Sequence, residues 1–361
     1  MKRAEDRSRS TAGLWVLAAG FVVAALAVSW HITTLLGGHR SRAIGDGHTV
    51  ASYGFRLAPA TIPVAEIVAT GMPRDGLPAL DAPGHLTRAG LESAAAGGFR
   101  KLLVGSDRVI GVCVAGECRA YPLRFLVWHE VVNDTLADVP LLVTYSPLTD
   151  SAVVFDRRAS GEPRTFRVSG LLYNSNLLLY DRSPEPGGES LWSQLAMRAV
   201  AGPAVAAGLT LAPRPTTVTT WAVWTVDHAT TTVLAPDPRL AAQYRRDPYS
   251  SYFGSDELRF PVAPLMPAGS LARKAPVLVV VEGGSFFVFP IERVAARAGR
   301  NGVWQTAVAG RPISIATAGN PLIASATADD GLPLVTLRCA AFAWYAFHPG
   351  GAAWLEPVPS R

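Results

Sequence analysis

The stretch that decides the fold is VIGVCVAGECRAYPLRFL, at residues 109–126. Two short apolar runs flank the dipeptide Ala115-Gly116, a pattern that is typical of a β-hairpin. A second stretch, PVLVVVEGGSFFVFPIERV at residues 276–294, repeats the order of strand, tight turn, strand, aromatic residue and proline. We interpret the two stretches as a distant internal repeat. The repeat predicts a mainly β (α+β) chain with two related β-rich lobes behind an N-terminal transmembrane helix.

The composition supports a folded body. The 361 residues are 49% hydrophobic and only 17% charged, which excludes a disordered chain. The sequence holds 33 glycines and 28 prolines, enough for many turns, so a helix-only fold is also excluded. The apolar spacing predicts few helices, at residues 191–200, 238–245 and 291–298.

We predict six segments along the chain. They are a cytoplasmic N-terminus at 1–11, a transmembrane signal-anchor helix at 12–36, a linker at 37–75, a first β-rich lobe at 76–200, an insertion or connection at 201–270 and a second β-rich lobe at 271–361. A cleft between two lobes is a common place for a ligand, so we expect a binding site there.

The predicted anchor is the longest apolar run of the sequence. Residues 12–28 contain no charged or strongly polar side chain, and the run extends to residue 36 with Trp15 and Trp30 near its ends. About 20 apolar residues cross a bilayer, and the basic residues before the run favour a cytoplasmic N-terminus. We therefore predict a single-pass cell-membrane protein that contacts the lipid bilayer through residues 12–36. A cleaved signal peptide, ending near Ala25-Leu26-Ala27, is the alternative.

The net charge of +5 lies almost entirely near the N-terminus. Residues 1–56 hold seven basic and three acidic side chains, so +1 is left for the other 305 residues. A surface that follows phosphates needs basic residues clustered over the folded body. We therefore exclude nucleic acid as a partner, and the sequence identifies no protein partner.

Two of the three cysteines occupy facing positions of the first predicted hairpin. With Ala115-Gly116 as the loop, Cys113 and Cys118 form a non-hydrogen-bonded pair with Cα atoms about 4.5 Å apart. This separation allows a disulfide. Two free thiols are the alternative, and a metal pair is disfavoured because no neighbouring residue supplies further ligands. Cys339 lies in an apolar run and is predicted to pack as a buried hydrophobic residue.

The densest polar cluster is Trp128-His129-Glu130-Val131-Val132-Asn133-Asp134. His129 is a candidate general base or metal ligand, and Glu130 and Asp134 are candidate oxygen ligands or proton acceptors. A hard or borderline cation suits this set because it contains no thiolate. The HExxH zinc pattern is not met, since residue 133 is Asn. The alternative interpretation is that these side chains cap turns and hold loops.

Further polar and aromatic side chains are candidate ligand-binding residues. Hydroxyl, amide and aromatic groups of this kind orient small ligands in apolar pockets. Ser146 would be a nucleophile only with a base such as His129 in reach. Turn and cap roles are the alternative for all of them. The set comprises Tyr145, Ser146, Ser169, Tyr173, Asn174, Ser175, Tyr180, Asp181, Trp192 and Gln194.

Several of these motifs resemble one known family, the domain of unknown function 3179, whose members are often exported or membrane-anchored. The resemblance covers about residues 75–350 and carries no established activity to transfer. The family usually has Cys-Pro-Leu-Cys after Val-Thr-Tyr, whereas this chain has Ser146-Pro147-Leu148-Thr149, so a thiol role is not expected there. The matching motifs include Arg119-Ala120-Tyr121-Pro122, Trp128-His129-Glu130, Val143-Thr144-Tyr145, Ser169-Gly170, Tyr173-Asn174-Ser175, Ser190-Leu191-Trp192-Ser193-Gln194 and Asp247-Pro248-Tyr249.

These observations lead to three functional hypotheses. The first is a membrane-anchored extracytoplasmic protein that binds a small polar ligand or a metal ion between its two lobes. The second is an enzyme with His129 as general base, oriented by Glu130 or Asp134. The third is a structural or assembly partner in the cell envelope.

Overall fold

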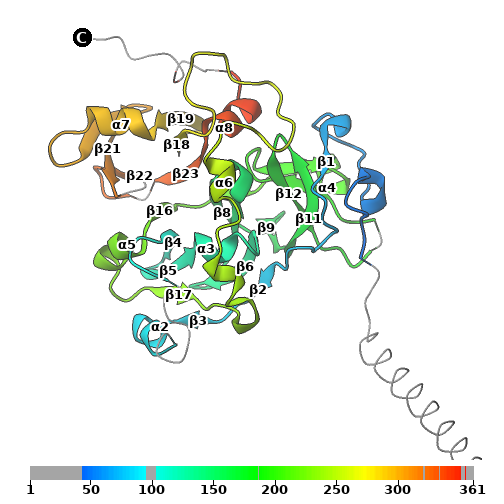
Figure 1. The fold of residues 1–361 in the computed structure, drawn as a ribbon, viewed down its shortest axis with the longest axis horizontal. Coiled ribbons are helices and arrows are strands. Elements are labelled where there is room, and N and C mark those ends of the chain that lie inside the picture. Colours follow the sequence, from blue (N-terminus) through cyan, green and yellow to red (C-terminus); the bar gives the residue numbers. More distant parts are fainter. Residues whose placement is uncertain are drawn as a thin grey trace, which may run out of the picture. The chain divides into compact units, whose positions relative to one another are not determined.

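Strands outnumber helices in the part of the chain that the structure describes. A computed structural model describes residues 43–94, 103–185, 187–319, 322–332, 334–350 and 354. Of the described residues, 38% lie in strands and 19% in helices, and the strands are arranged in several sheets (Figure 1). The predicted mainly β class is therefore confirmed.

The first predicted hairpin forms as expected within a five-stranded sheet. β4 (Arg108–Val114) pairs with β5 (Glu117–Pro122), and Cys113 faces Cys118 across the pair. The order of the sheet is β16 (Thr217–Thr220), β4, β5, β17 (Thr232–Leu234) and β3 (His85–Leu86).

The largest sheet joins the middle of the chain to its end. Its order is β19 (Ser285–Pro290), β18 (Pro276–Glu282), β23 (Val335–Ala340), β8 (Ser151–Asp156), β7 (Val139–Ser146), β6 (Val131–Leu136) and β2 (Leu80–Asp81), with β15 (Ala212–Pro213) also paired to β8.

Three smaller sheets complete the set. One has the order β1 (Val68–Ala69), β11 (Phe166–Tyr173), β12 (Asn176–Asp181), β13 (Leu191–Ser193) and β14 (Arg198–Ala201). The others are β20 (Val303–Val308), β21 (Arg311–Ala318) and β22 (Ile323–Ala328), and the pair β9 (Arg158–Ala159) and β10 (Glu162–Pro163). Residues 191–200, predicted as a helix, are therefore mostly strand, because β13 pairs with β12 and buries Leu191 and Trp192.

The helices of the described residues are short. They are α2 (Arg88–Ala94), α3 (Leu123–Leu126), α4 (Pro203–Ala206), α5 (Trp221–Asp227), α6 (Ser250–Phe253), α7 (Ile291–Arg297) and α8 (Ala341–Phe347). Single 3-10 turns occur at η1 (Val50–Tyr53), η2 (Val64–Glu66), η4 (Pro147–Thr149), η5 (Pro238–Leu240) and η6 (Gln243–Arg245). α3 and α7 begin directly after Pro122 and Pro290, since proline ends the strand ladder but suits a helix start.

Two parts of the chain have the same order of elements. β4, β5, α3 and the meander β6–β7–β8 correspond to β18, β19, α7 and the meander β20–β21–β22. A later strand then pairs with the first strand of each hairpin, β16 with β4 and β23 with β18. A seven-residue helix follows in both cases, α5 or α8. The described residues from Ile44 onward form one compact unit, and the lobe boundaries at residues 76, 201 and 271 stay a prediction.

The central strands β7 and β8 are covered on both faces. On β8, Val153 and Phe155 point into the cluster shared with β11, β12 and α8, whereas Ala152 and Val154 point into the cluster shared with the β4–β5 hairpin and α3. Side chains alternate between the faces of a strand, so one strand contributes to two cores. This double burial fixes the position of the η4 turn that joins β7 to β8.

The predicted membrane topology requires a correction. In the described part of the chain, no helix is long and apolar enough to cross a membrane. Its longest helices have seven residues, about 10 Å at 1.5 Å per residue, against about 30 Å of hydrocarbon. The localisation as a single-pass membrane protein is therefore wrong by this finding. Residues 12–36, on which it was based, lie outside the described residues.

A buried ion cluster ties η4 to both hairpin sheets. Asp150, which follows η4, accepts hydrogen bonds from Arg108 of β4 at 2.8 Å, Arg338 of β23 at 3.0 Å and the Tyr145 hydroxyl at 2.9 Å. Burial opposes ionisation of Asp150, but the two guanidinium charges outweigh it and hold the pKa of this carboxyl below its ordinary value. The carboxylate therefore stays charged and joins three elements.

We expect Asp150→Asn to lower the free energy of unfolding by about 3–5 kcal/mol, because it leaves the buried Arg338 and the partly buried Arg108 without their counter-charge. Urea denaturation at pH 7 measures this loss. The control is Asp330→Asn, which breaks an exposed pair with Arg311 and should leave the free energy of unfolding nearly unchanged. Equal losses in the two variants would contradict the central role of Asp150.

Candidate functional site

The η4 turn lies between two cavities. Leu148 of η4 lines one cavity and Pro147 lines the other, while Tyr249 lines both. Tyr249 belongs to the connecting segment, which we define as residues 238–262 and which includes η5, η6 and α6. This segment passes over η4, where the Tyr252 hydroxyl donates to the Leu148 carbonyl at 3.0 Å. Figure 1 shows α6 in front of β8, near the middle of the view.

The first cavity has a volume of about 250 Å³ and mostly apolar walls. β11 and its neighbours supply much of the wall. Glu130 and Arg259 are its two ionisable side chains besides Tyr249. We call it the Glu130 cavity; it is lined by Thr70, Met72, Pro73, Leu77, Glu130, Leu148, Val168, Gly170, Leu171, Leu172, Leu177, Tyr249, Arg259 and Phe260.

Glu130 is held in place through its backbone rather than its side chain. Its φ of 58° lies in the left-handed region, which is costly for a residue with a side chain. Its N–H donates to the Leu126 carbonyl at 2.7 Å, and its carbonyl accepts from the Tyr145 backbone N–H at 2.9 Å. These two bonds support the unusual conformation. They direct the start of β6 past the cavity.

The carboxyl group of Glu130 has no hydrogen bond or ion pair to any residue that the structure describes. Burial therefore acts without a compensating partner and raises the pKa of Glu130 to about 8. At pH 7 most molecules carry this group as a neutral carboxylic acid, which can donate a hydrogen bond. Perturbed groups of this kind in a cavity are candidate functional residues.

Arg259 supplies the positive charge of the Glu130 cavity. Its side chain is exposed, and its guanidinium carbon lies 5.8 Å from the ring centre of Tyr249 and 5.0 Å from that of Tyr252. Such cation–π contacts leave the N–H donors of arginine free to bind an anion. Burial, reinforced by the charge of Glu130, raises the pKa of Tyr249 to about 12, so its hydroxyl stays protonated.

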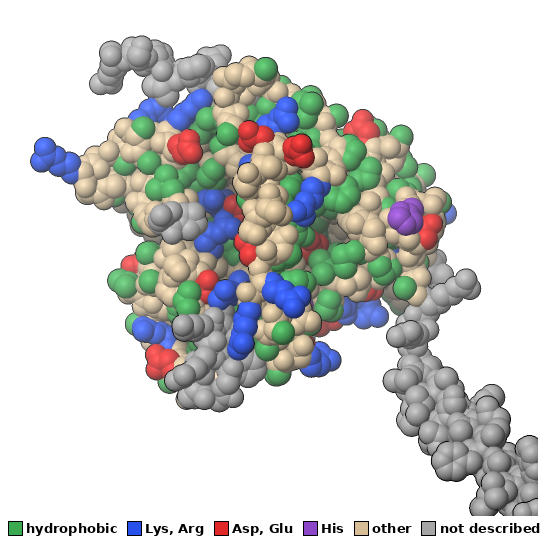
Figure 2. Space-filling model, in the orientation of Figure 1, with side chains coloured by type: hydrophobic (Ala, Val, Ile, Leu, Met, Phe, Trp, Pro, Cys, Tyr) green, Lys and Arg blue, Asp and Glu red, His purple; other side chains and the backbone are tan. Residues whose placement is uncertain are grey.

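The second cavity, of about 270 Å³, lies on the other side of Tyr249 and contains several basic residues. Arg108 and Arg124 line it but are engaged by Asp150 and Asp107. Asp107 and Asp247 also line the cavity, so it is mixed in charge. The space-filling view (Figure 2) likewise shows basic side chains on both sides of its middle, among acidic and hydrophobic ones.

A buried hydrogen-bond network lies behind η4. Gln194 donates to Thr144 at 2.9 Å and accepts from Ser151 at 2.5 Å and from Asn176 at 2.9 Å. Thr149, at one position of the family's Cys pair, accepts from Asn176 at 2.9 Å and contacts Ser151. Ser146, at the other position, accepts from the Leu177 N–H at 3.4 Å. In this chain hydroxyl groups occupy both positions and contact β8 and β12.

His129 is engaged at both ring nitrogens. Nδ1 lies 2.7 Å from the Pro78 carbonyl and Nε2 lies 2.6 Å from the Tyr244 hydroxyl, and the residue is only 1% exposed. Since Nδ1 donates to the carbonyl, Nε2 accepts from Tyr244. Burial lowers the pKa of His129, consistent with a neutral ring. Its role as a general base stays a prediction, without a free nitrogen in this structure.

Asp134 is also fully engaged. Its carboxylate contacts His85 and Arg119 at 2.9 Å and the Tyr121 hydroxyl at 2.7 Å, and it accepts the Thr135 N–H at 2.7 Å. Among the described residues, the ligand atoms of His129, Glu130 and Asp134 do not come together as a metal-binding group.

The other candidate residues hold loops and strands. Tyr145 bonds Asp150, Tyr180 bonds Asp75, and Asp181 accepts from Arg164 and from the Ser190 N–H. Ser169, Asn174 and Ser175 bond backbone groups, while Tyr173 packs on Phe347 and Trp192 on Phe166. In the described structure none of these side chains lines the Glu130 cavity. Their ligand-binding role stays a prediction.

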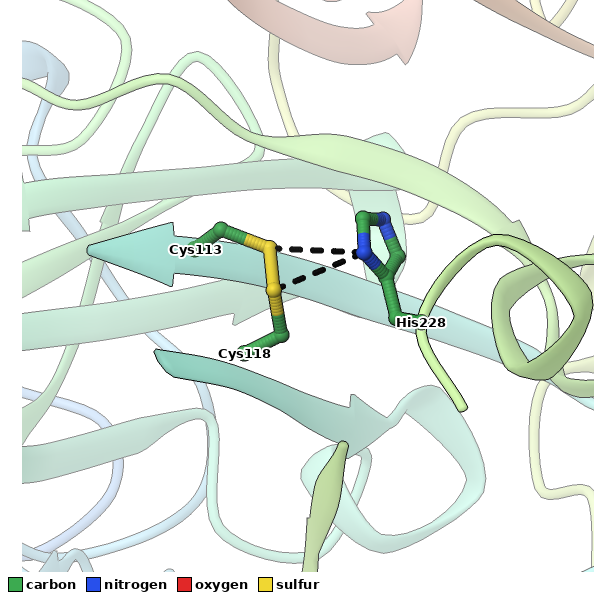
Figure 3. Close-up of side chains that lie close together, drawn as sticks. All are labelled: Cys113, Cys118 and His228. Carbon is green, nitrogen blue, oxygen red and sulfur yellow. Dashed lines mark hydrogen bonds between the residues drawn. A yellow bond between two sulfur atoms is a disulfide. The ribbon is translucent and has the colours of Figure 1, made fainter. Parts of the chain in front are cut away.

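The disulfide prediction is confirmed. Cys113 and Cys118 are bonded, with Cα atoms 4.2 Å apart. His228 lies beside the bond, with Nδ1 3.5 Å from the Cys118 sulfur and 3.8 Å from the Cys113 sulfur (Figure 3). The sequence did not reveal that His228 lies beside the cysteines, because it follows them by more than 100 residues. Sequence reasoning also assigned no role to Tyr249 or Arg259. For Tyr249 the family resemblance was an available signal; for Arg259 there was none.

The fold and these contacts define a mainly β protein of several sheets with a cavity beside the η4 turn. The family model described as "Protein of unknown function (DUF3179)" matches residues 74–337, most of the chain. The chain belongs to this family, as the sequence motifs predicted. No curated protein and no solved structure matches.

Glu130→Gln should remove a pH dependence of stability. The folded state binds the Glu130 proton up to about pH 8 and the unfolded state only up to about 4.5, so stability falls as pH rises through this window. At pH 9 we expect the free energy of unfolding of the variant to exceed that of wild type by a few kcal/mol, the order of magnitude that this pKa shift implies. At pH 4 we expect the two free energies to be equal. Chemical denaturation across pH 4–9 measures it.

The matched control is Glu162→Gln, at an exposed glutamate. Its stability curve should run parallel to that of wild type at every pH. A parallel curve for Glu130→Gln as well would show that Glu130 titrates normally.

Proposed function

We propose that this protein binds a small organic molecule in the Glu130 cavity. The observation that carries the proposal is a partly buried carboxyl group with no partner among the described residues, set in mostly apolar walls. Buried polar groups are normally hydrogen-bonded, and an unpaired one at a cavity surface is suited to a ligand. This site lies between β11 and the connecting segment rather than between the two predicted lobes.

The charges favour a ligand with one anionic group. At pH 7 Glu130 is mostly protonated and neutral, because its pKa is about 8, while Arg259 is positive. A carboxylate can therefore accept a hydrogen bond from either side chain, and arginine binds carboxylates with parallel N–H groups. The apolar walls suit the rest of the molecule.

The volume sets the size of the ligand. Sites for drug-sized ligands measure about 300–1,000 Å³. At about 250 Å³ the Glu130 cavity is below this range. A single-ring acid is therefore the class that we propose, and benzoate is a suitable probe.

The raised pKa of Glu130 also favours an enzymatic alternative. A carboxyl that titrates near pH 8 can give and take protons at neutral pH, as a general acid or base must. In this alternative Glu130, and not His129, carries the proton. A bell-shaped or sigmoidal rate profile with a midpoint near pH 8 would distinguish catalysis from binding alone.

Isothermal titration with benzoate and benzylamine tests the binding proposal, since the two probes share a ring and differ in charge. At pH 6.5 we expect benzoate to bind about tenfold or more tightly than benzylamine. At pH 9 Glu130 is mostly ionised and repels benzoate, while benzylamine is still mostly protonated, so the order should reverse. Glu130→Gln should keep benzoate binding at both pH values, because the amide still donates.

Arg259→Ala should weaken benzoate binding about tenfold. The control is Arg297→Ala, which removes a similar cation–π contact with Trp304 outside this cavity. Absence of saturable binding of either probe at millimolar concentration, or equal effects of the two arginine variants, would overturn the proposal.

A further inference from the structure

The Cys113–Cys118 pair occupies a place that is repeated in the second hairpin without sulfur. Cys113 faces Cys118 across β4 and β5, and Val281 faces Phe286 across β18 and β19 at the same distance from the turn. The helix after the returning strand supplies a tryptophan and a histidine four residues later in both parts. These are Trp224 and His228 at α5, and Trp344 and His348 at α8.

The two histidines differ in their polar contacts. His348 stacks on Trp344 with ring centres 4.1 Å apart, packs on Phe286 and uses Nε2 toward the Leu195 carbonyl at 3.1 Å. His228 packs on Trp224 in a tilted arrangement with ring centres 3.9 Å apart, but within the described structure its imidazole makes its polar contacts with the two sulfur atoms. His228 and His348 therefore both pack on a tryptophan ring, but only His228 has two sulfur atoms beside its imidazole.

The three side chains bring one imidazole nitrogen and two sulfur atoms close together. The Nδ1 atom and both sulfur atoms lie within 4.8 Å of one another, the one such His/Cys/Asp/Glu group in the described residues. Zn–S bonds of about 2.3 Å and Zn–N bonds of about 2.1 Å in a tetrahedral site place nitrogen and sulfur about 3.6 Å apart. The observed distances are 3.5 and 3.8 Å. Figure 3 shows the imidazole pointing at the sulfur pair.

We propose that Cys113, Cys118 and His228 form a redox-controlled site for Zn²⁺, closed in the disulfide state and opened by reduction. A dithiol reductant transfers two electrons and two protons to the Cys113–Cys118 disulfide. The S–S bond between these cysteines breaks and two thiols form, while the reductant is oxidised to a disulfide. Zn²⁺ binding then releases both thiol protons, and His228 coordinates the ion through the Nδ1 lone pair.

The surroundings allow both reductant and metal to reach the site. Cys113 is exposed, and it lines a groove of about 320 Å³ with Thr217, Trp224 and His228. Trp224 itself is fixed because its Nε1 donates to Thr231 at 2.9 Å. Three protein ligands leave one coordination position open toward the groove, for water or a further ligand.

The test uses the full chain in reduced and oxidised forms, titrated anaerobically with ZnCl₂ against a chromophoric chelator. We expect one Zn²⁺ per reduced chain and none per oxidised chain. His228→Ala should weaken binding about tenfold or more, and His348→Ala should leave it unchanged. The double variant Cys113→Val with Cys118→Phe, which copies the second hairpin, should abolish binding.

Cobalt(II) added to reduced protein gives a second, spectroscopic readout. Thiolate-to-cobalt charge-transfer absorption should appear on reduction and persist in Cys339→Ser, which removes the buried third thiol. The proposal is overturned if the reduced protein binds no Zn²⁺ and gives no such absorption, if the oxidised form binds equally, or if His228→Ala binds as tightly as wild type.

Discussion

The structure depends on one buried carboxylate, Asp150, at the junction of its sheets. Arg108 comes from the first hairpin and Arg338 from β23, 188 residues after Asp150, and both bind the same side chain. Two guanidinium charges can be buried only if an anion compensates them. The position of η4, and with it the walls of both neighbouring cavities, follows from this requirement.

Two carboxyl groups near η4 illustrate how environment decides their chemistry. Asp150 is surrounded by donors, so its pKa lies below the ordinary value despite burial. Glu130 has no donor among the described residues, and its pKa rises to about 8. The first group stabilises the fold. The second is a weak acid in an apolar cavity, and it is the basis for our proposed function.

Local signals in the sequence predicted local structure well. The β-hairpin at Cys113 and Cys118 and its disulfide follow from turn residues and strand alternation alone. Residues 191–200 were misread as a helix, because the pairing of β13 with β12 overrides helix propensity and depends on distant residues. The candidate site was only partly predictable. Glu130 belonged to a dense polar motif. The sequence around His129, Asp134 and Arg259 did not show whether each side chain would lie in the cavity or outside it.

The position of β23 has a consequence for how the chain acquires its fold. This strand, residues 335–340, lies between β18 and β8 in the middle of the largest sheet. The sheet therefore cannot be completed until residues 335–340 have left the ribosome. Contacts of such long sequence separation slow folding and leave strand edges open in the meantime. A chain shortened before residue 335 would expose the edges of β8 and β18, which invites aggregation.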